Sequence, residues 1–527
     1  MTDSTLFVGG SVFTGRRYCE ALLVENGKVV VAGTEDDARR RAPTGVEVHP
    51  LGGGLLLPGL VDAHVHVAEL TRSREGLDLS RVTSIEGLVE AIREWGAGHP
   101  SGPLVGRRWD PERAPDRAWP TRHELDRAAP DRPVVVVHVS GHAVVANSIA
   151  LSEAGFDRTT PDPPGGRLGR EGNGTPDGRV FEAAIRALRG RAIDPDLPEP
   201  SALRRTLQWA TSLGITTYGA MSASPEEAVL LRELAGSGTL PGRVRVYLEG
   251  SRWEEYFRGP AGPPVPPGRF AVVGVKAYTD GAFGTRTAWL SEPYADAPET
   301  EGMSVAADAE LRELLGASAQ RGLTPALHAI GDRAIAYSLG LLEEMRTTGG
   351  PPARIEHAAL TPPWLFPALA RVRPALVVQP GFLWSDHWLG ARVGARRARW
   401  AYAFRSLQEQ GHLLAGSSDA PYDPVDPWRG IRAAVERSDA RGRSANGSPE
   451  EALGCEEALR LYTVNGGATF AEPALGRLEP GAPADLVWVR APSLESAIVE
   501  GSAGVRGTWV EGARGAARTE ERGEETV

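Results

Sequence analysis

Cysteine is almost absent from this chain of 527 residues, because only Cys19 and Cys455 occur. A single possible bridge in so long a chain excludes the disulfide framework of a small secreted protein, and we expect a cytoplasmic one. No run of about 18 consecutive apolar residues is present, which excludes a transmembrane helix. Residues 1–15 also lack the basic start, apolar run and cleavage site of a signal peptide.

Positive charge is in deficit as well. Lys and Arg together number 58 and Asp and Glu 68, so the net charge is −10. Nucleic acids and anionic membranes attract basic surfaces, and this balance therefore argues against both as partners. A hydrophobic content of 41% with 24% charged residues is that of a globular chain and excludes disorder as a whole. We expect a small-molecule partner, and a homodimer remains open.

The middle of the chain alternates apolar, strand-like runs with helical patterns such as 307–321, 333–347 and 427–437. This order favours an α/β fold, a parallel (β/α)₈ barrel of the TIM type, over the alternative of an open doubly wound sheet. The eight candidate strands are Leu60–Val67, Ile215–Met221, Val244–Glu249, Val272–Tyr278, Thr324–Ile330, Arg354–Ala358, Leu376–Pro380 and Leu413–Ser417.

Two regions fall outside the alternation. About 150 residues separate the first two strands, far more than a crossover needs, so residues 70–200 or thereabouts are predicted to be an insertion that covers the catalytic face. Short β-runs at both ends predict one small β-sandwich, from residues 1–57 and 466–512, around a barrel at 58–465. The small, charged tail at 513–527 is predicted to be disordered.

Histidines gather at the predicted strand ends. His64 and His66 lie two residues apart on the first strand, so that both imidazoles face one side, as two ligands of one metal require. His328, His357 and Asp419 each follow a later apolar run, at the end where barrels place their chemistry. Each of them could merely cap its strand, but that explanation must then hold separately for every strand. Nitrogen-rich ligation favours Zn²⁺, one or two ions, with Mn²⁺, Fe²⁺ or Co²⁺ as alternatives.

Lysine is scarcer than any other charged residue. Lys28 and Lys276 are the only two, so 58 − 2 = 56 basic residues are arginines. Lys28 occupies a predicted turn, whereas Lys276 lies in an apolar run where a free ammonium is costly. A neutral lysine amine reacts with carbon dioxide to give an anionic carbamate that bridges two metals, and arginine cannot do this. We favour a metal role for Lys276 over a snorkelling or ion-paired lysine.

These residues lie in motifs that resemble the amidohydrolase superfamily, and more closely its amidohydrolase family 3 branch, which includes the N-substituted formamide deformylases. The resemblance covers roughly residues 5–510. The motifs are Leu57–His66, Gly141-His142 with Asn147-Ser148 and Ala150-Leu151, Val275–Ala282, His328–Ala334, Arg354–Ala358, Gln379-Pro380, Ser418–Pro421 and Gly481–Val487. One departure is Asn465-Gly466-Gly467, where the family has Asn-x-Ala.

The resemblance implies a metal-dependent hydrolase with a barrel and a terminal β-sandwich. It implies metal ligands at His64, His66, Lys276, His328, His357 and Asp419. Asp419 is then also the general base and acid, and Lys276 takes part in catalysis through the metal site. Whether the corresponding lysine is carboxylated varies across the superfamily.

Three functions remain to be weighed. The first is hydrolysis of a non-peptide C–N bond, in a linear amide such as an N-substituted formamide, by metal-activated water. The second is deamination or cyclic amide or imide hydrolysis on the same barrel, although deaminase relatives generally lack the lysine ligand. The third is a catalytically inactive binding protein, although none of the six ligand positions is lost.

Four further residues are candidates for substrate contact. His142, in the insertion, is a possible donor to the substrate. Asp280 and Arg286 follow the fourth strand and could reach the barrel mouth, with loop anchoring as the alternative. Trp384 follows the seventh strand and could line an apolar pocket, with surface packing as the alternative.

Overall fold

The computed structural model describes residues 4–115, 117–193, 196–260, 262–347, 353–438 and 448–515. Its centre is an eight-stranded sheet in which every pair of neighbouring strands is parallel. The strands in order are β8 (Leu60–Val65), β15 (Ile215–Ala223), β16 (Arg243–Glu249), β17 (Phe270–Tyr278), β18 (Thr324–Ala329), β19 (Arg354–His357), β20 (Ala375–Val378) and β21 (Leu414–Gly416). None of the helices in the described ranges combines the length and apolar character needed to cross a membrane.

The two edges of this sheet meet at the carboxyl end of β8. Asp419, just beyond β21, donates its N–H to the carbonyl of His64 at 2.8 Å, and His66 donates its N–H to the carbonyl of Ala420 at 2.9 Å. These backbone bonds bring the edges together into a barrel, which confirms the predicted TIM-type fold and rules out the open sheet. Helices α9 (Asp308–Gln320), α10 (Asp332–Thr347) and α16 (Pro427–Glu436) lie where the helical patterns predicted them.

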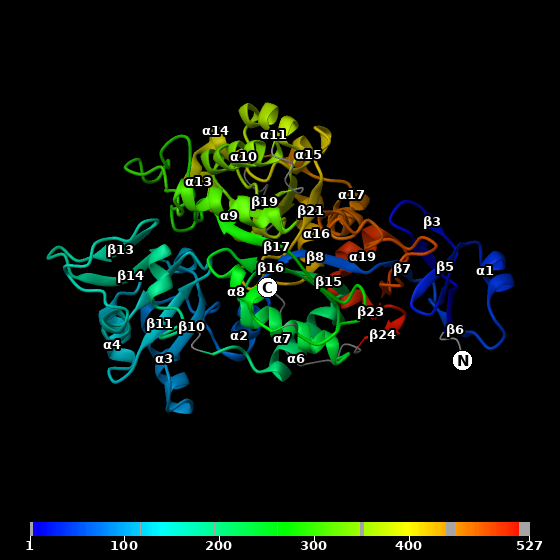
Figure 1. Cartoon of the computed structure of the whole chain (residues 1–527), viewed down its shortest axis with the longest axis horizontal. Coiled ribbons are helices and arrows are strands. Elements are labelled where there is room, and N and C mark those ends of the chain that lie inside the picture. The colour runs from blue at the N-terminus through cyan, green and yellow to red at the C-terminus, as the bar shows by residue number, and fades with distance from the viewer. Residues whose placement is uncertain are drawn as a thin grey trace.

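Strands from both ends of the chain share one sheet. Its order is β24-β23-β22-β7-β2-β3, so that β22 (Leu486–Val489), β23 (Val505–Val510) and β24 (Ala513–Arg514) extend the sheet of β7 (Leu55–Pro58), β2 (Ser11–Phe13) and β3 (Tyr18–Cys19). A second sheet, β5-β4-β1-β6, comes from β1 (Ser4–Val8), β4 (Ala21–Glu25), β5 (Lys28–Gly33) and β6 (Glu47–Pro50). In Figure 1 these blue and red strands lie together at the right.

The predicted tail begins too early, because Ala513 and Arg514 form β24 by pairing with Val510 and Trp509. The rest of that tail, from residue 516, lies outside the described residues.

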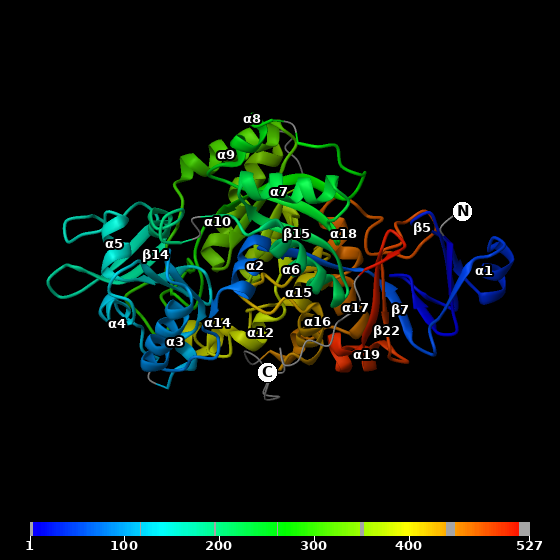
Figure 2. The ribbon, with the colours of Figure 1, turned by 90° about the horizontal axis from the view of Figure 1, so that it is seen from below.

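A third sheet occupies the long interval between β8 and β15. Its order is β13-β14-β12-β11-β10-β9, from β9 (Leu77–Asp78), β10 (Leu104–Trp109), β11 (Val134–His138), β12 (Ala143–Ala146), β13 (Gly166–Arg170) and β14 (Pro176–Glu182). Figures 1 and 2 both show this cyan sheet on the side of the barrel away from the terminal strands. The barrel is therefore flanked at one side by an internal segment and at the other by the two chain ends.

A buried ion pair ties the barrel to the terminal strands. Arg243, at the start of β16, donates to both carboxylate oxygens of Asp485, at 2.6 and 3.2 Å, and both side chains are at least 95% buried. Asp485 immediately precedes β22 and also accepts the N–H of Glu511 at 2.8 Å. The Asp485 carboxylate thus joins two parts of the chain that are far apart in sequence.

Replacing Asp485 by Ala should lower the free energy of unfolding by about 3–5 kcal/mol, since it leaves the Arg243 guanidinium buried beside fewer negative charges. Denaturant unfolding followed by circular dichroism measures the loss. Glu90→Ala is the matched control, because Glu90 pairs with Arg93 at 2.9 Å on an exposed helix face, where such pairs contribute under about 1 kcal/mol. Equal losses in the two variants would contradict the structural role of Asp485.

Glu227 connects the helices that follow the first two barrel strands. Its carboxylate, on α7 (Pro225–Gly236), accepts the N–H of Ala68 at 3.0 Å, at the start of α2 (Val67–Glu75). Burial raises the pKa of Glu227 to about 7. The ionised form therefore opposes folding, so the contribution of this group to stability is greatest below the unfolded pKa of about 4.5 and is lost as the pH rises through 7.

Glu227→Gln should therefore stabilise the protein at pH 8 but not at pH 4.5, because glutamine keeps the acceptor for Ala68 and cannot ionise. The shift in pKa corresponds to a difference of about 3 kcal/mol between the two pH values. Thermal unfolding of the two proteins at both pH values measures the effect. A variant with the same advantage at pH 4.5 as at pH 8 would show that ionisation of Glu227 is not responsible.

Candidate metal centre

Three of the predicted ligands meet at one oxygen atom. His64 is the last residue but one of β8 and His66 follows the strand directly, and their Nε2 atoms lie 3.4 Å apart. Each of these nitrogens is 3.1 Å from Oδ1 of Asp419. That oxygen is buried and makes no hydrogen bond of acceptable geometry with any described residue. All three side chains are at least 90% buried.

The tautomer of His64 follows from its hydrogen bond to Glu356. Nδ1 of His64 lies 2.6 Å from the Glu356 carboxylate and donates an N–H hydrogen bond to it. In a neutral ring Nε2 is then a lone pair that faces the Asp419 oxygen, an arrangement that repels unless a cation lies between them. Ligand atoms that surround one ion at about 2.0–2.2 Å are about 3.0–3.5 Å from one another. The three separations fall in that range, and the residues fit a metal.

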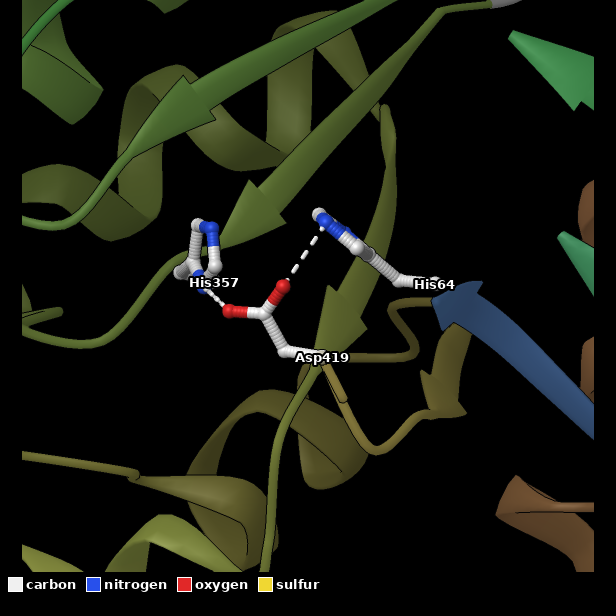
Figure 3. A group of neighbouring side chains, drawn as sticks. All are labelled: His64, His357 and Asp419. Atoms are coloured by element: carbon white, nitrogen blue, oxygen red, sulfur yellow. Dashed lines mark ion pairs between the residues drawn. The ribbon is translucent and has the colours of Figure 1, made fainter. Parts of the chain in front are cut away.

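His357 brings a fourth group to the same place. Figure 3 shows His64, His357 and Asp419 facing one another from the ends of separate strands, and their possible ligand atoms all lie within 4.8 Å of one another. Nδ1 of His357 is 2.8 Å from Oε1 of Gln379 and 4.0 Å from Oδ2 of Asp419. His357 and Asp419 have φ angles of 73° and 58°, which are uncommon for residues other than glycine and are found disproportionately at functional sites.

His328 and Lys276 complete the set from neighbouring strands. The ring centroid of His328 is 4.4 Å from that of His357. Its Nε2 lies 3.0 Å from the Gly281 carbonyl and can donate to it, which leaves Nδ1 as the ligand atom. Lys276 is 1% exposed, with Nζ 5.0 Å from the centroid of the Tyr278 ring, and has no ion pair among the described residues. The structure thus brings all six predicted ligand side chains to one end of the barrel.

Burial sets the protonation of these groups. It lowers the pKa of His66, holds that of His328 well below its usual value and brings that of His357 to about 3, so that all three rings are neutral at pH 7. Neutral imidazole is the form that binds metals. Burial also lowers the pKa of Lys276 to about 8. An appreciable fraction of this lysine is therefore the reactive, neutral amine near neutral pH.

Sequence analysis missed two residues that orient the ligands. Glu356 accepts from His64 and also from Arg354, whose Nε and Nη2 lie 2.5 and 2.9 Å from its two oxygens. Burial alone would raise the pKa of Glu356, but the Arg354 charge outweighs it and the pKa falls well below the usual range. A signal was present, because Arg354 and Glu356 are opposite charges two positions apart in an apolar strand. Gln379, which contacts His357, lies in the motif Gln379-Pro380, but its residue type alone pointed to no role.

Sequence analysis also assigned no role to Asp62, which lies in the motif Leu57–His66. It is 1% exposed, and its carboxylate accepts the N–H and the hydroxyl of Ser418, at 3.0 and 2.5 Å. Burial raises the pKa of Asp62 to about 6. Since Ser418 precedes Asp419, Asp62 holds the segment that carries the shared carboxylate against β8.

His142 reaches the centre from the third sheet, as its candidacy for substrate contact requires. Its ring centroid lies 5.0 Å from that of His328, and Nδ1 lies 2.8 Å from Glu182. Burial would lower the pKa of His142, but the charge of Glu182 outweighs this and raises it. Glu182 in turn accepts the hydroxyl of Thr287 at 2.5 Å. This chain of contacts fixes the ring relative to the loop after β17.

The remaining candidates have other partners. The buried Asp280 accepts the backbone N–H groups of Trp289, Ile330 and Gly331 at 2.8–3.0 Å, although it is also 3.5 Å from Nε2 of His328. It therefore anchors the loop after β17, and burial raises its pKa to about 7.

Arg286 and Trp384 contact residues outside the candidate metal centre, and their part in substrate contact stays a prediction. Arg286 pairs with Asp296 at 2.8 Å, a contact that favours the alternative of loop anchoring. Trp384, on α12 (Phe382–Ser385), lies beneath the guanidinium of Arg429 at 4.7 Å from its ring centroid. Its ring thus contacts α16, which favours the alternative of surface packing over an apolar pocket.

Known proteins are similar to this chain in sequence and in fold. The model of the amidohydrolase family matches residues 47–514. YtcJ of Bacillus subtilis, which is named as an amidohydrolase, is 35% identical over 503 residues that cover 90% of this chain and 92% of the relative. The N-substituted formamide deformylase of Arthrobacter pascens is 26% identical, with 85% of each chain covered.

A solved structure agrees with these matches. A metal-dependent hydrolase from Pyrococcus horikoshii superimposes with a TM-score of 0.76 at 29% identity, over 93% of this chain and 98% of the other. The family model spans the barrel and all six predicted ligand positions. This chain is therefore an enzyme that belongs to the amidohydrolase family, the metal-dependent hydrolases of carbon–nitrogen bonds.

Proposed function

We propose that this protein hydrolyses a linear amide, such as an N-substituted formamide, with Zn²⁺ held by His64, His66, Lys276, His328, His357 and Asp419. The observation that carries the proposal is the buried Asp419 oxygen, which two imidazole nitrogens approach to 3.1 Å without a hydrogen bond. A bound divalent cation supplies hydroxide near neutral pH and polarises the carbonyl. Mn²⁺, Fe²⁺ and Co²⁺ suit the same donors.

The residues of the chain handle the protons in this proposal. Asp419 takes a proton from the attacking water and delivers it to the departing nitrogen. Glu356 keeps the proton of His64 on Nδ1, and Gly281 keeps that of His328 on Nε2. His142, fixed by Glu182, donates a hydrogen bond to the substrate carbonyl. Asp280 supports the loop from which Gly281 accepts.

The division of the chain is part of the same proposal. The two terminal sheets form one small β-sandwich, and the segment between β8 and β15 covers the barrel mouth. Support for the second statement comes from the contact between the rings of His142 and His328. The barrel then supplies the metal ligands and the covering segment supplies residues that contact the substrate.

The function is tested with N-butylformamide, a cyclic imide and adenosine as substrates. The purified enzyme loaded with Zn²⁺ should release formate from N-butylformamide, and protein treated with a chelator should not until Zn²⁺ is restored. Ring opening of the imide or release of ammonia from adenosine, without release of formate, would overturn the proposal in favour of cyclic hydrolysis or deamination.

Asp419→Asn should reduce kcat by about 10²–10⁴-fold, because asparagine cannot accept the proton, and should change the metal content much less. Steady-state formate release and elemental analysis of the same samples measure the two effects. An Asp419→Asn enzyme that keeps most of its activity would show that this residue is a ligand without a role in proton transfer.

In this proposal Lys276 is a modified metal ligand and not a structural cation. Its ammonium first loses one proton, and the neutral amine nitrogen then forms a bond to the carbon of carbon dioxide with release of a second proton, so that a cation becomes an anion. The low exposure of the side chain and its lowered pKa, about 8, favour this reaction. An unmodified ammonium would instead repel a metal held by His64 and Asp419.

Lys276→Arg should therefore lose activity although it preserves the positive charge, because a guanidinium does not form the carbamate. Lys276→Ala should be partly rescued by a short carboxylic acid such as propionate. Formate release with and without propionate, together with metal content, measures both effects. Lys28→Arg is the matched control, because Lys28 is exposed at the start of β5. Full activity of Lys276→Arg would identify the lysine as a structural cation.

A further inference from the structure

A crevice lies beside the metal centre, where the third sheet meets the barrel. Arg107, Arg108 and Arg189 line it from the segment between β8 and β15, and Glu69 and Tyr422 line it from the barrel. Aliphatic side chains from β11, β12 and the stretch 185–193 form the rest of its wall. The crevice therefore combines positive charge with apolar surface.

Two of the lining residues connect the crevice to the metal ligands. The ring centroid of Tyr422 is 5.1 Å from that of His66, and the N–H of Tyr422 donates to the carbonyl of Asp419 at 3.0 Å. Glu69 lies in the first turn of α2, which begins directly after His66. A molecule whose reacting bond is at the metal centre can thus extend one arm into the crevice.

The lining carries more positive than negative charge. Three guanidinium groups face one carboxylate, Glu69, which is 3.6 Å from Arg107 and is also shared with Arg72 at 3.1 Å. Arg108 is 3.6 Å from Asp78.

Arg189 differs from these arginines. It lines the crevice and has no ion pair among the described residues. The carboxylates of Glu69 and Glu249 are nevertheless close enough for their charges to interact with it. Its guanidinium makes no hydrogen bond with a described residue, so its N–H donors can bind a ligand.

We propose that this crevice binds a carboxylate carried by the substrate, with Arg189 as the anchoring cation. This inference rests on the proposed function, which it deepens by naming the substrate class: linear amides with a carboxylate at the end of an aliphatic arm. A guanidinium binds a carboxylate through two parallel hydrogen bonds. The aliphatic side chains of the wall offer apolar contacts to the methylene groups nearest the carboxylate.

Two matched substrates test the proposal, N-formyl-6-aminohexanoate and the uncharged N-formylhexylamine, with the enzyme loaded with Zn²⁺. Arg189→Gln should lower kcat/KM for the anionic amide by about tenfold or more, the loss expected for a hydrogen-bonded ion pair. The same variant should change kcat/KM for the neutral amide by less than about twofold. Arg186→Gln is the matched control, because Arg186 is an exposed arginine of the same stretch that does not line the crevice.

The preference between the two substrates reports directly on Arg189. Wild-type enzyme should prefer the anionic amide, and Arg189→Gln should abolish that preference while Arg186→Gln preserves it. A preference that survives Arg189→Gln, or is absent from the wild-type enzyme, overturns the carboxylate site.

A binding measurement separates this inference from the proposed function. Hexanoate, titrated into the same proteins by calorimetry, should bind wild type and Arg186→Gln alike and Arg189→Gln about tenfold more weakly. If no formamide is hydrolysed but hexanoate still distinguishes the variants in this way, the proposed reaction fails and the carboxylate site stands. Equal binding of hexanoate to all three proteins overturns the carboxylate site whatever the reaction.

Discussion

The barrel interior and the candidate metal centre both depend on the contacts of the buried Glu356 carboxylate with Arg354 and His64. This carboxylate neutralises Arg354, which also donates to the Ala63 carbonyl at 2.8 Å and to the Tyr247 hydroxyl at 3.0 Å, and it holds the proton of His64. Removing one partner of such a buried pair costs about 3–5 kcal/mol, because the other charge remains without compensation. One interaction therefore stabilises the interior of the barrel and also orients the first predicted ligand.

Closure of the barrel and assembly of the candidate metal centre are a single structural event. The backbone bonds that join the edges of the sheet belong to His64, His66, Asp419 and Ala420, so the sheet closes through the predicted ligands themselves. Asp62 adds side-chain bonds across the same seam, to Ser418. Positive φ angles at His357 and Asp419 persist because these surrounding contacts hold the backbone in place. A change that breaks these closing hydrogen bonds would thus displace the predicted metal ligands.

The predicted ligands and the proposed substrate contacts come from different parts of the chain. The barrel supplies the predicted ligands, whereas the segment between β8 and β15 supplies His142 and the three arginines of the crevice. Glu69, in the first turn of α2, and Tyr422 each lie three residues from a predicted ligand and also line the crevice. This separation allows the inserted sheet to change its substrate contacts while the ligands stay constant, as barrels of this type permit.

The sequence alone was enough to predict the eight barrel strands and the common location of the six predicted ligands, because apolar runs alternate with helical patterns and parallel strands end at a common face. It was also enough to pair His64 with His66, since residues two apart on a strand face the same side. Only the tertiary structure revealed that Glu356 and His357, adjacent in sequence, both serve the centre, because a φ of 73° breaks the alternation at His357. The surroundings of Trp384 and Arg189 likewise come from segments distant in sequence, Arg429 for the first and Glu69 for the second, and no local pattern encodes which charges long-range packing will place beside them.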